Sequence, residues 1–244
     1  VYGTISKGRR SPVLNRTAAA GPAGPRPNLV LVDEERVWNY EGGIKGAAGG
    51  FSGTVGVFYQ NYTNFQTSLV NTQGQIVPVN AGRANNFGVE VEAAYAPNSN
   101  LRIFANYAYI DAKIGTPAGA GNTQFVGSRF RLQPEHTASG GIDVSFPVGN
   151  GSVELFATPT ATYQSSVFFE IPNNPLIAED AYALVNLRAG VRFGEGRYQI
   201  AGFARNLLDR NYLIDAGNTG FVFGTPTFIA GEPRLYGIEI SARY

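Results

Sequence analysis

The feature that most constrains the fold of this chain is an alternation of short and long connections between segments of strand-like periodicity. Short turns rich in Gly, Pro and Asn, typical of tight hairpins, occur at 46–50, 97–99, 147–150 and 194–196. Longer connections separate these turns, at 9–34, 65–84, 113–133, 165–179 and 213–231. The segments in between alternate with period 2, which indicates strands rather than helices. Ten strands are predicted, beginning near Val1, Arg36, Phe51, Asn86, Asn100, Glu135, Gly151, Ala181, Arg197 and Pro233.

Within the predicted strands, alternate residues separate an uncharged face from a charged one. One uncharged face consists of every second residue from Phe87 to Tyr95, whereas Glu90 and Glu92 point to the opposite side. The other charged residues expected on that second face are Lys45, Arg102, Asp143, Glu154, Arg188, Arg192, Glu239 and Arg243. A soluble β-sandwich also alternates in this way, so the faces alone leave two fold classes open. Short turns on one side and long connections on the other favour an outer-membrane barrel.

Aromatic residues at the ends of the uncharged faces favour the same alternative. Three pairs stand eight residues apart, namely Phe51/Tyr59, Phe87/Tyr95 and Tyr236/Tyr244. Eight residues of strand span ~26 Å, which in a tilted strand is close to the apolar band and aromatic girdles of a membrane barrel. We therefore predict an all-β chain over residues 1–244. Its class is a transmembrane antiparallel up-and-down β-barrel with the uncharged face toward lipid.

Composition agrees with this class. The chain is 43% hydrophobic but only 15% charged, against roughly 25% charged in soluble domains. No apolar run approaches the roughly 20 residues of a membrane-spanning helix. A net charge of +1 without a basic cluster gives no reason to expect nucleic acid as a partner. The chain has neither Met nor Cys and opens at Val1 in a strand-like pattern without a signal peptide, as expected of a processed or truncated chain.

Several segments resemble, in family order, the barrel of TonB-dependent receptors. They are Val37-Trp-Asn-Tyr-Glu-Gly-Gly-Ile-Lys45, the pair of segments 86–95 and 100–109, Asn206-Leu-Leu-Asp-Arg-Asn-Tyr212, and the last segment 231–244. The resemblance implies about ten C-terminal strands of a 22-stranded barrel in the outer membrane of a Gram-negative bacterium. It also implies uptake of ferric siderophores or similar nutrients, without enzymatic activity or a cofactor. TonB is then a partner only through an N-terminal plug region, to which no segment of this sequence corresponds.

The last strand carries a candidate assembly signal. In the resembled family a terminal aromatic strand is read by the barrel-assembly machinery, through strand addition at the exposed edge. The alternative is a lipid-facing edge strand that needs the same pattern for its own sake. The residues assigned to this signal are Tyr236, Ile238, Ile240, Ala242 and Tyr244.

A candidate ligand site lies in two of the long connections. Aromatic faces and guanidinium groups together suit an anionic, aromatic ferric chelate. Packing between the loops is the alternative reason for such residues. The candidates are Arg129, Phe130, Arg131, Phe221 and Phe223.

The remaining candidates argue against catalytic and metal chemistry. His136 is the single histidine, and its alternation places it with Ala138 on an uncharged face near the interface. No catalytic or metal-binding residues are therefore predicted. The charged faces are expected to form salt bridges along the lumen, or else to line a transport path. A complete ten-stranded barrel acting as a protease or adhesin stays the alternative function.

Overall fold

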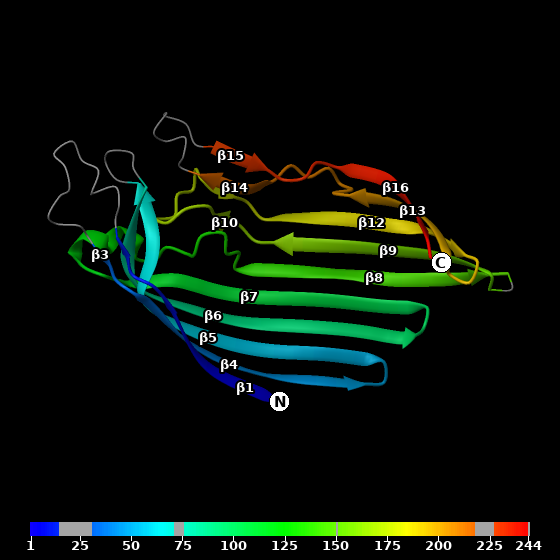
Figure 1. Cartoon of the computed structure of the whole chain (residues 1–244), viewed down its shortest axis with the longest axis horizontal. Coiled ribbons are helices and arrows are strands. Elements are labelled where there is room, and N and C mark those ends of the chain that lie inside the picture. The colour runs from blue at the N-terminus through cyan, green and yellow to red at the C-terminus, as the bar shows by residue number, and fades with distance from the viewer. Residues whose placement is uncertain (15–30, 71–75, 150, 218–226, 244) are drawn as a thin grey trace.

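One antiparallel sheet dominates the structure, a computed structural model that describes residues 1–14, 31–70, 76–149, 151–217 and 227–243. Within these residues, ten strands pair in sequence order, each with the sheet strands before and after it (Figure 1). The strands are β1 (Tyr2–Arg10), β4 (Glu35–Ala48), β5 (Phe51–Val70), β6 (Ile76–Asn98), β7 (Leu101–Pro117), β8 (His136–Val148), β9 (Val153–Gln164), β12 (Tyr182–Phe193), β13 (Tyr198–Arg205) and β16 (Leu235–Ala242). This is the predicted up-and-down order.

The hairpin turns gather at one end of the sheet and the longer connections at the other (Figure 1). At the turn end, Ala48 pairs with Phe51, and Gly49 and Gly50 between them have φ angles of 57° and 80°. A two-residue hairpin loop with both φ angles positive strongly favours glycine. At the far end lie β2 (Val13–Leu14), β3 (Leu31–Val32), η1 (Ala120–Phe125), β10 (Val167–Phe168), β11 (Ala178–Glu179), β14 (Leu213–Gly217) and β15 (Thr227–Ala230). The predicted asymmetry of connections is confirmed.

The register confirms the two predicted faces. Phe51 pairs directly with Tyr95, and Tyr59 with Phe87, so each aromatic pair from β5 meets its counterpart on β6. The aromatic residues therefore form two rows across the sheet, one near each end of the apolar band. The third pair is only partly visible, because Tyr244 lies outside the described residues.

Ten strands do not close into a ring. The edges of the sheet are β1 and β16, which do not pair with each other. The chain forms an open, curved wall, which agrees with ten strands of a larger barrel. Two hollows of about 450 and 530 Å³ lie against the charged side of the sheet. The charged face is thus the concave one, and the apolar face is the outer one.

One strand begins much earlier than predicted. β6 starts at Ile76, although the sequence predicted a strand near Asn86 and a connection over 65–84. The hairpin of β5 and β6 continues through a register shift between Tyr62 and Phe65, where Asn64 has φ 57°. A bulge of this kind interrupts the period-2 pattern. The period-2 pattern therefore suggested that the two strands end at the bulge, although the backbone pairing of β5 with β6 continues beyond it.

No helix among the described residues is long and apolar enough to cross a membrane.

Candidate functional site

The concave face carries a continuous chain of charged contacts across four strands. Arg192 on β12 forms an ion pair with Glu154 on β9 and donates to the Gln199 side-chain oxygen on β13 at 3.1 Å. Arg188 on β12 contacts both carboxylate oxygens of Glu239 on β16, at 2.9 and 3.3 Å. Further along the sheet, Arg102 pairs with Asp143 at 3.2 Å. The predicted salt bridges are thus present for Arg102, Asp143, Glu154, Arg188, Arg192 and Glu239, which are six of the residues expected on the charged face.

Phe156 on β9 organises this network, and sequence reasoning missed it. Its ring is buried on the charged face between two guanidinium groups. The Cζ atom of Arg192 lies 4.2 Å from the ring centroid, and that of Arg188 lies 5.1 Å away. An arginine over an aromatic face is attracted by the ring's negative potential. The available signal was an aromatic residue on the polar side of an alternating strand.

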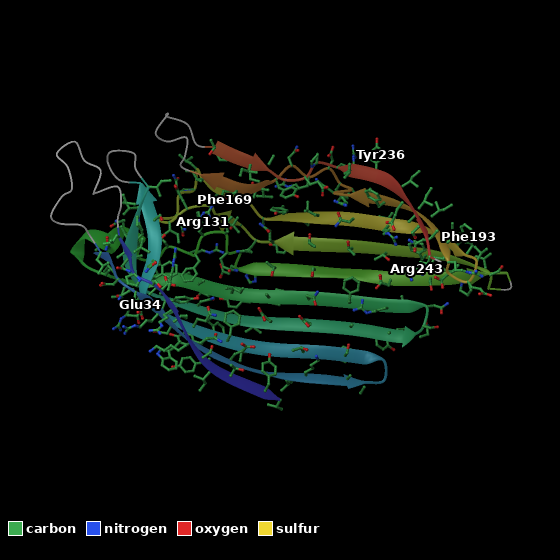
Figure 2. All side chains as sticks on the ribbon, in the orientation of Figure 1. Glu34, Arg131, Phe169, Phe193, Tyr236 and Arg243 are labelled. Carbon is green, nitrogen blue, oxygen red and sulfur yellow. The ribbon has the colours of Figure 1, made fainter. Side chains whose placement is uncertain are left out.

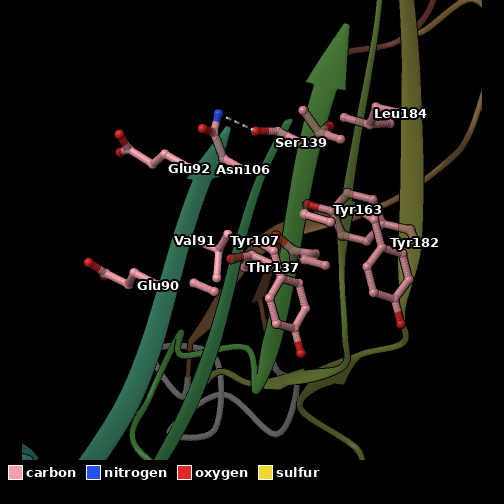
Figure 3. A pocket seen from close by; sticks show the side chains of 14 residues that line it. Glu90, Val91, Glu92, Asn106, Tyr107, Thr137, Ser139, Tyr163, Tyr182 and Leu184 are labelled. Atoms are coloured by element: carbon pink, nitrogen blue, oxygen red, sulfur yellow. Dashed lines mark hydrogen bonds between the residues drawn. The ribbon is translucent and has the colours of Figure 1, made fainter. Parts of the chain in front are cut away.

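A second stretch of the concave face is a hollow with free carboxylates. Glu90 and Glu92 on β6 point into the open space of this face, and Asn106 of β7 donates to Ser139 of β8 at 3.2 Å (Figure 3). Among the described residues, neither glutamate has a cationic partner within salt-bridge distance. The hollow is therefore acidic and solvated, unlike the neutralised network between β9 and β16.

The long-connection end of the sheet is a packed assembly of loops. Arg131, after η1, donates to the Phe169 carbonyl oxygen and, at 2.6 Å, to the Asp215 carboxylate. These partners belong to the segments after β9 and β13, so one guanidinium joins three connections. Arg131 and Phe169 lie together at this end of the molecule (Figure 2).

The two residues before Arg131 also pack against neighbouring segments. The backbone N–H of Arg129 donates to the Asn173 side-chain oxygen at 2.6 Å, and its guanidinium lies 6.0 Å from the Phe168 ring. Phe130 stacks on Phe65 with ring centroids 4.5 Å apart. These are the contacts expected of loop packing, and the part of these residues in ligand binding stays a prediction. Phe221 and Phe223 lie outside the described residues.

Sequence reasoning did not find the partners of these arginines. Asn173 holds the Arg129 backbone from both sides, since its amide also donates to the Arg129 carbonyl at 3.0 Å. Asp215 stands alone in its connection with no charge pattern around it. Neither residue has a periodic signal, because contacts between loops follow no repeat along the chain.

The segment after β13 is a turn held by one asparagine. Asn206 has φ 47° and is buried. Its side-chain oxygen accepts from the Arg210 N–H at 2.8 Å, while its amide donates to the carbonyls of Arg210 and Glu232. Asn tolerates this left-handed conformation and hydrogen-bonds its own backbone in turns. Asn206 therefore joins the end of β13 to the segment that leads into β16.

The last strand presents its apolar side as predicted. Tyr236, Ile238 and Ile240 on β16 are 77%, 78% and 77% exposed, on the side opposite Glu239. Ala242 ends the strand in register with Tyr198, and Tyr244 lies beyond the described residues. The role of these residues in assembly stays a prediction.

His136 lies on the outer face at the start of β8. Its Nδ1 is 2.9 Å from the Tyr107 hydroxyl, and its ring is 5.2 Å from that of Tyr109. His136 thus lies on the uncharged face, as the alternation predicted, in a cluster with two tyrosines. Its place at the membrane interface stays a prediction. In the part of the chain that the structure describes, no group of three His, Cys, Asp or Glu side chains is placed to hold a metal ion.

An open antiparallel wall with an apolar outer face, two aromatic rows and an ionic concave face defines the class of outer-membrane β-barrels. The chain belongs to the TonB dependent receptor-like β-barrel family, whose sequence pattern matches residues 1–207. This family consists of transporters of the Gram-negative outer membrane and not of enzymes.

One curated relative resembles the chain in sequence, and two solved structures resemble it in fold. The ferrichrome outer membrane transporter/phage receptor of Escherichia coli K12 is 27% identical over 164 residues, which is 65% of this chain and 21% of that protein. The crystal structure of the ferric yersiniabactin uptake receptor FyuA from Yersinia pestis superposes with a TM-score of 0.78 at 18% identity, over 98% of this chain and 34% of that one. The copper transporter OprC gives a TM-score of 0.70 at 15% identity, over 99% and 36%. The chain thus spans about a third or less of these relatives.

Proposed function

We propose that this chain forms part of the barrel wall of a receptor that imports a ferric siderophore or a similar metal chelate. The observation that carries the proposal is the arrangement of the sheet. A concave charged face runs beneath a packed set of long connections that bears two arginines and several aromatic rings. A ligand held by those connections has a polar wall directly below it. The family assignment supports transport of the ligand from the long-connection end of the sheet toward the turn end.

The chelate class rests on the chemistry of this chain and on the names of its relatives. Guanidinium groups and aromatic rings suit an anionic ligand with flat rings. The ferrichrome and ferric yersiniabactin receptors carry iron complexes in their names. OprC is a copper transporter, but this chain has no Cys or Met and one His, so it contributes few of the soft or imidazole ligands that copper prefers. A metal enclosed in a chelate is therefore the better substrate class.

The energy for uptake is assigned to TonB, through an N-terminal plug region. The chain described here supplies wall and connections, and Glu90 and Glu92 leave negative charge free on the concave face. Such a face suits contact with a cationic surface inside the barrel. A complete ten-stranded barrel acting as protease or adhesin finds less support, because the sheet is open at β1 and β16.

Two variants test whether Arg131 meets the ligand or only holds the loops together. Arg131→Ala should weaken binding of an anionic ferric chelate about tenfold or more, because a charge-assisted hydrogen bond is worth about 1.5–3 kcal/mol. Asp215→Asn removes the loop ion pair and leaves the guanidinium in place, so affinity should stay within about threefold of the parent protein. Fluorescence titration with catecholate, hydroxamate and phenolate iron complexes measures both.

The same two variants can also contradict a ligand role of Arg131. Equal losses in the two variants mean that Arg131 acts through loop packing alone, and the ligand role of this residue is then wrong. If none of the chelates binds the gene product and none supports growth under iron limitation, the proposed substrate class is wrong.

A further inference from the structure

Three arginines line a hollow of about 530 Å³ at the turn end of the concave face. They are Arg188 and Arg192 on β12 and Arg243 directly after β16, and Figure 2 shows Arg243 at this end of the sheet. The same hollow is lined by Gln199, Ser241 and Glu239. Among the described residues, two carboxylates contact these cations, Glu239 at Arg188 and Glu154 at Arg192. The described part of this hollow therefore keeps one uncompensated positive charge.

These guanidinium groups also keep unused hydrogen-bond donors. A guanidinium group has five N–H donors in one plane. Arg188 uses its Nε and Nη2 atoms on Glu239, and Arg192 uses Nε and Nη1 on neighbouring side chains. Arg243 has neither an ion pair nor a side-chain hydrogen bond among the described residues. Because guanidinium groups bind carboxylate oxygens strongly through their free N–H groups, the hollow can hold a further oxyanion.

An aromatic ring fixes the orientation of two of the arginines. The Phe156 ring lies between them, and its centroid is 4.2 Å from the Cζ atom of Arg192 and 5.1 Å from that of Arg188. Such contacts hold the guanidinium planes in place before a ligand arrives, which lowers the entropy lost on binding. Both arginine side chains stay partly exposed, so a flat anionic ring can stack on them. The hollow thus fits an aromatic anion better than a compact one such as phosphate.

Strand β9 connects this hollow with the arginines of the long connections. From the long-connection end toward Phe156, its concave face consists of Gln164, Thr162, Thr160 and Thr158. Thr162 lines the hollow of about 450 Å³, and Thr158 pairs directly with Arg188. The segment after β9 contacts the connection that carries Arg131, because Arg131 donates to the Phe169 carbonyl oxygen. An uncharged row of amide and hydroxyl groups thus runs from one group of arginines to the other.

The charge of the concave face changes sign across the sheet. On β4 and β6 this face carries Glu41, Glu90 and Glu92, which have no ion pair among the described residues. On β12 and directly after β16 it carries the three arginines of the turn-end hollow. An anion on the concave side is repelled by the first region and attracted by the second. β9 lies between the two regions and next to β12, so its uncharged row borders the cationic part of the wall.

We propose that Arg188, Arg192 and Arg243 form a second anion-binding site, which receives the imported ligand after it has left the long connections and passed along β9. This set is called the turn-end anion site below. Its ligand class is an aromatic oxyanion, such as a phenolate, catecholate or carboxylate group of a metal chelate. The ligand oxygens accept hydrogen bonds from Arg243 and from the unused N–H groups of the other two arginines. The inference rests on the proposed function, because that function supplies the ligand.

Two carboxylates give the turn-end anion site the moderate affinity that passage requires. A ligand in transit has to bind well enough to enter a site and weakly enough to leave it. Glu154 and Glu239 offset part of the positive charge of the three arginines. Removal of one of these carboxylates should therefore strengthen the binding of an anion. A salt-bridge network with a purely structural role does not produce that result.

Isothermal titration calorimetry of the full-length gene product with phthalate, an aromatic dicarboxylate without a metal, tests the turn-end anion site. Arg243→Gln should weaken phthalate binding about three- to tenfold, because it removes one charge-assisted pair. Glu239→Gln should strengthen it about twofold or more, because a competing carboxylate is lost. Lys45→Gln is the matched control. It removes another cation of the concave face near the turn end, unpaired among the described residues, and should change the affinity by less than about twofold.

Uptake by cells gives a readout that a structural role of Arg243 would not move. Arg243→Gln should lower the maximal uptake rate of a ferric catecholate complex about threefold or more, because the ligand loses a site on its way through the barrel. The external half-saturation concentration and the melting temperature should stay as in the parent protein. Arg131→Ala, at the long-connection end, should instead raise the half-saturation concentration. Lys45→Gln should change neither the rate nor the half-saturation concentration.

Two results overturn the proposal. Equal phthalate affinities of Arg243→Gln and Lys45→Gln mean that the hollow is not an anion site. A lower melting temperature of Arg243→Gln, without phthalate binding by the parent protein, means that a carboxylate of another segment of the gene product occupies the hollow. Phthalate binding that depends on Arg243, in a protein that binds no ferric chelate, supports the anion site and contradicts the substrate class proposed above. The two failures are therefore distinguishable.

Discussion

At the scale of single residues, the face of the sheet on which a position lies decides which residue types that position tolerates. Neighbours along one strand face different media although their backbones are equivalent. Ala161 and Thr162 on β9 illustrate this, because Ala161 pairs with Gly140 on the outer face while Thr162 pairs with Ser139 at the hollow. The two residues lie at nearly the same depth. They therefore provide a matched test of the membrane assignment.

Ala161→Arg should destabilise the folded receptor by about 2–4 kcal/mol, whereas Thr162→Arg should change its stability by less than about 1 kcal/mol. The physical reason is that a charge on the lipid side leaves water for hydrocarbon, and one on the concave side stays hydrated. Folding titrations of the full-length gene product in lipid vesicles measure both values. Equal tolerance at the two positions contradicts the assignment of the faces.

At the scale of elements, strands and connections are held by different forces. The strands are stabilised by the backbone hydrogen bonds between them and by the membrane or water that each face contacts. The connections are stabilised by specific side chains such as Arg131, Asn173 and Asn206. β16, like β1, has one open edge, and the apolar side of β16 is strongly exposed. An exposed strand edge with a regular apolar face is a natural template for strand addition.

Deleting Tyr244 should reduce the amount of receptor in the outer membrane far more than deleting Val1. The motivation is the apolar series of Tyr236, Ile238, Ile240 and Ala242, which Tyr244 would complete. Surface labelling of intact cells, normalised to total expression, measures the effect. Normal surface levels of the Tyr244 deletion would show that the terminal aromatic only packs against lipid.

At the scale of the whole molecule, the open sheet determines what residues 1–244 can do by themselves. The backbone groups of β1 and β16 that face outward from the sheet have no partner strand among the described residues. In hydrocarbon each such group costs several kcal/mol, so a stable wall needs further strands on both edges. The match to about a third of the length of the solved relatives agrees with this requirement.

Residues 1–244 expressed alone should therefore not restore uptake. In a receptor-deficient strain they should give no TonB-dependent growth on the ferric chelate proposed above as substrate, whereas the full-length gene product should restore it. Growth yields of the two strains on limiting iron measure this directly. Rescue by residues 1–244 would mean that this sheet closes and functions without other strands.

The sequence by itself determined the strands, their order, their two faces and the end at which the turns lie. These properties are local, because period 2 follows from the strand geometry and tight turns need particular residues within a few positions. It misplaced the start of β6, where a bulge interrupts the period although the ladder continues. The family could also be recognised from the sequence, because each motif that carries the resemblance spans only a short stretch of the chain.

Only the tertiary structure decided which side chains meet across the connections and across the strands. Arg131 and Asp215 are 84 residues apart, and no periodicity links them. Arg188 and Arg243 lie in separate segments of the sequence, yet the registers of β12 with β13 and of β13 with β16 bring them to one hollow. Register and loop packing depend on contacts between distant segments, and these contacts exist only once the sheet has formed.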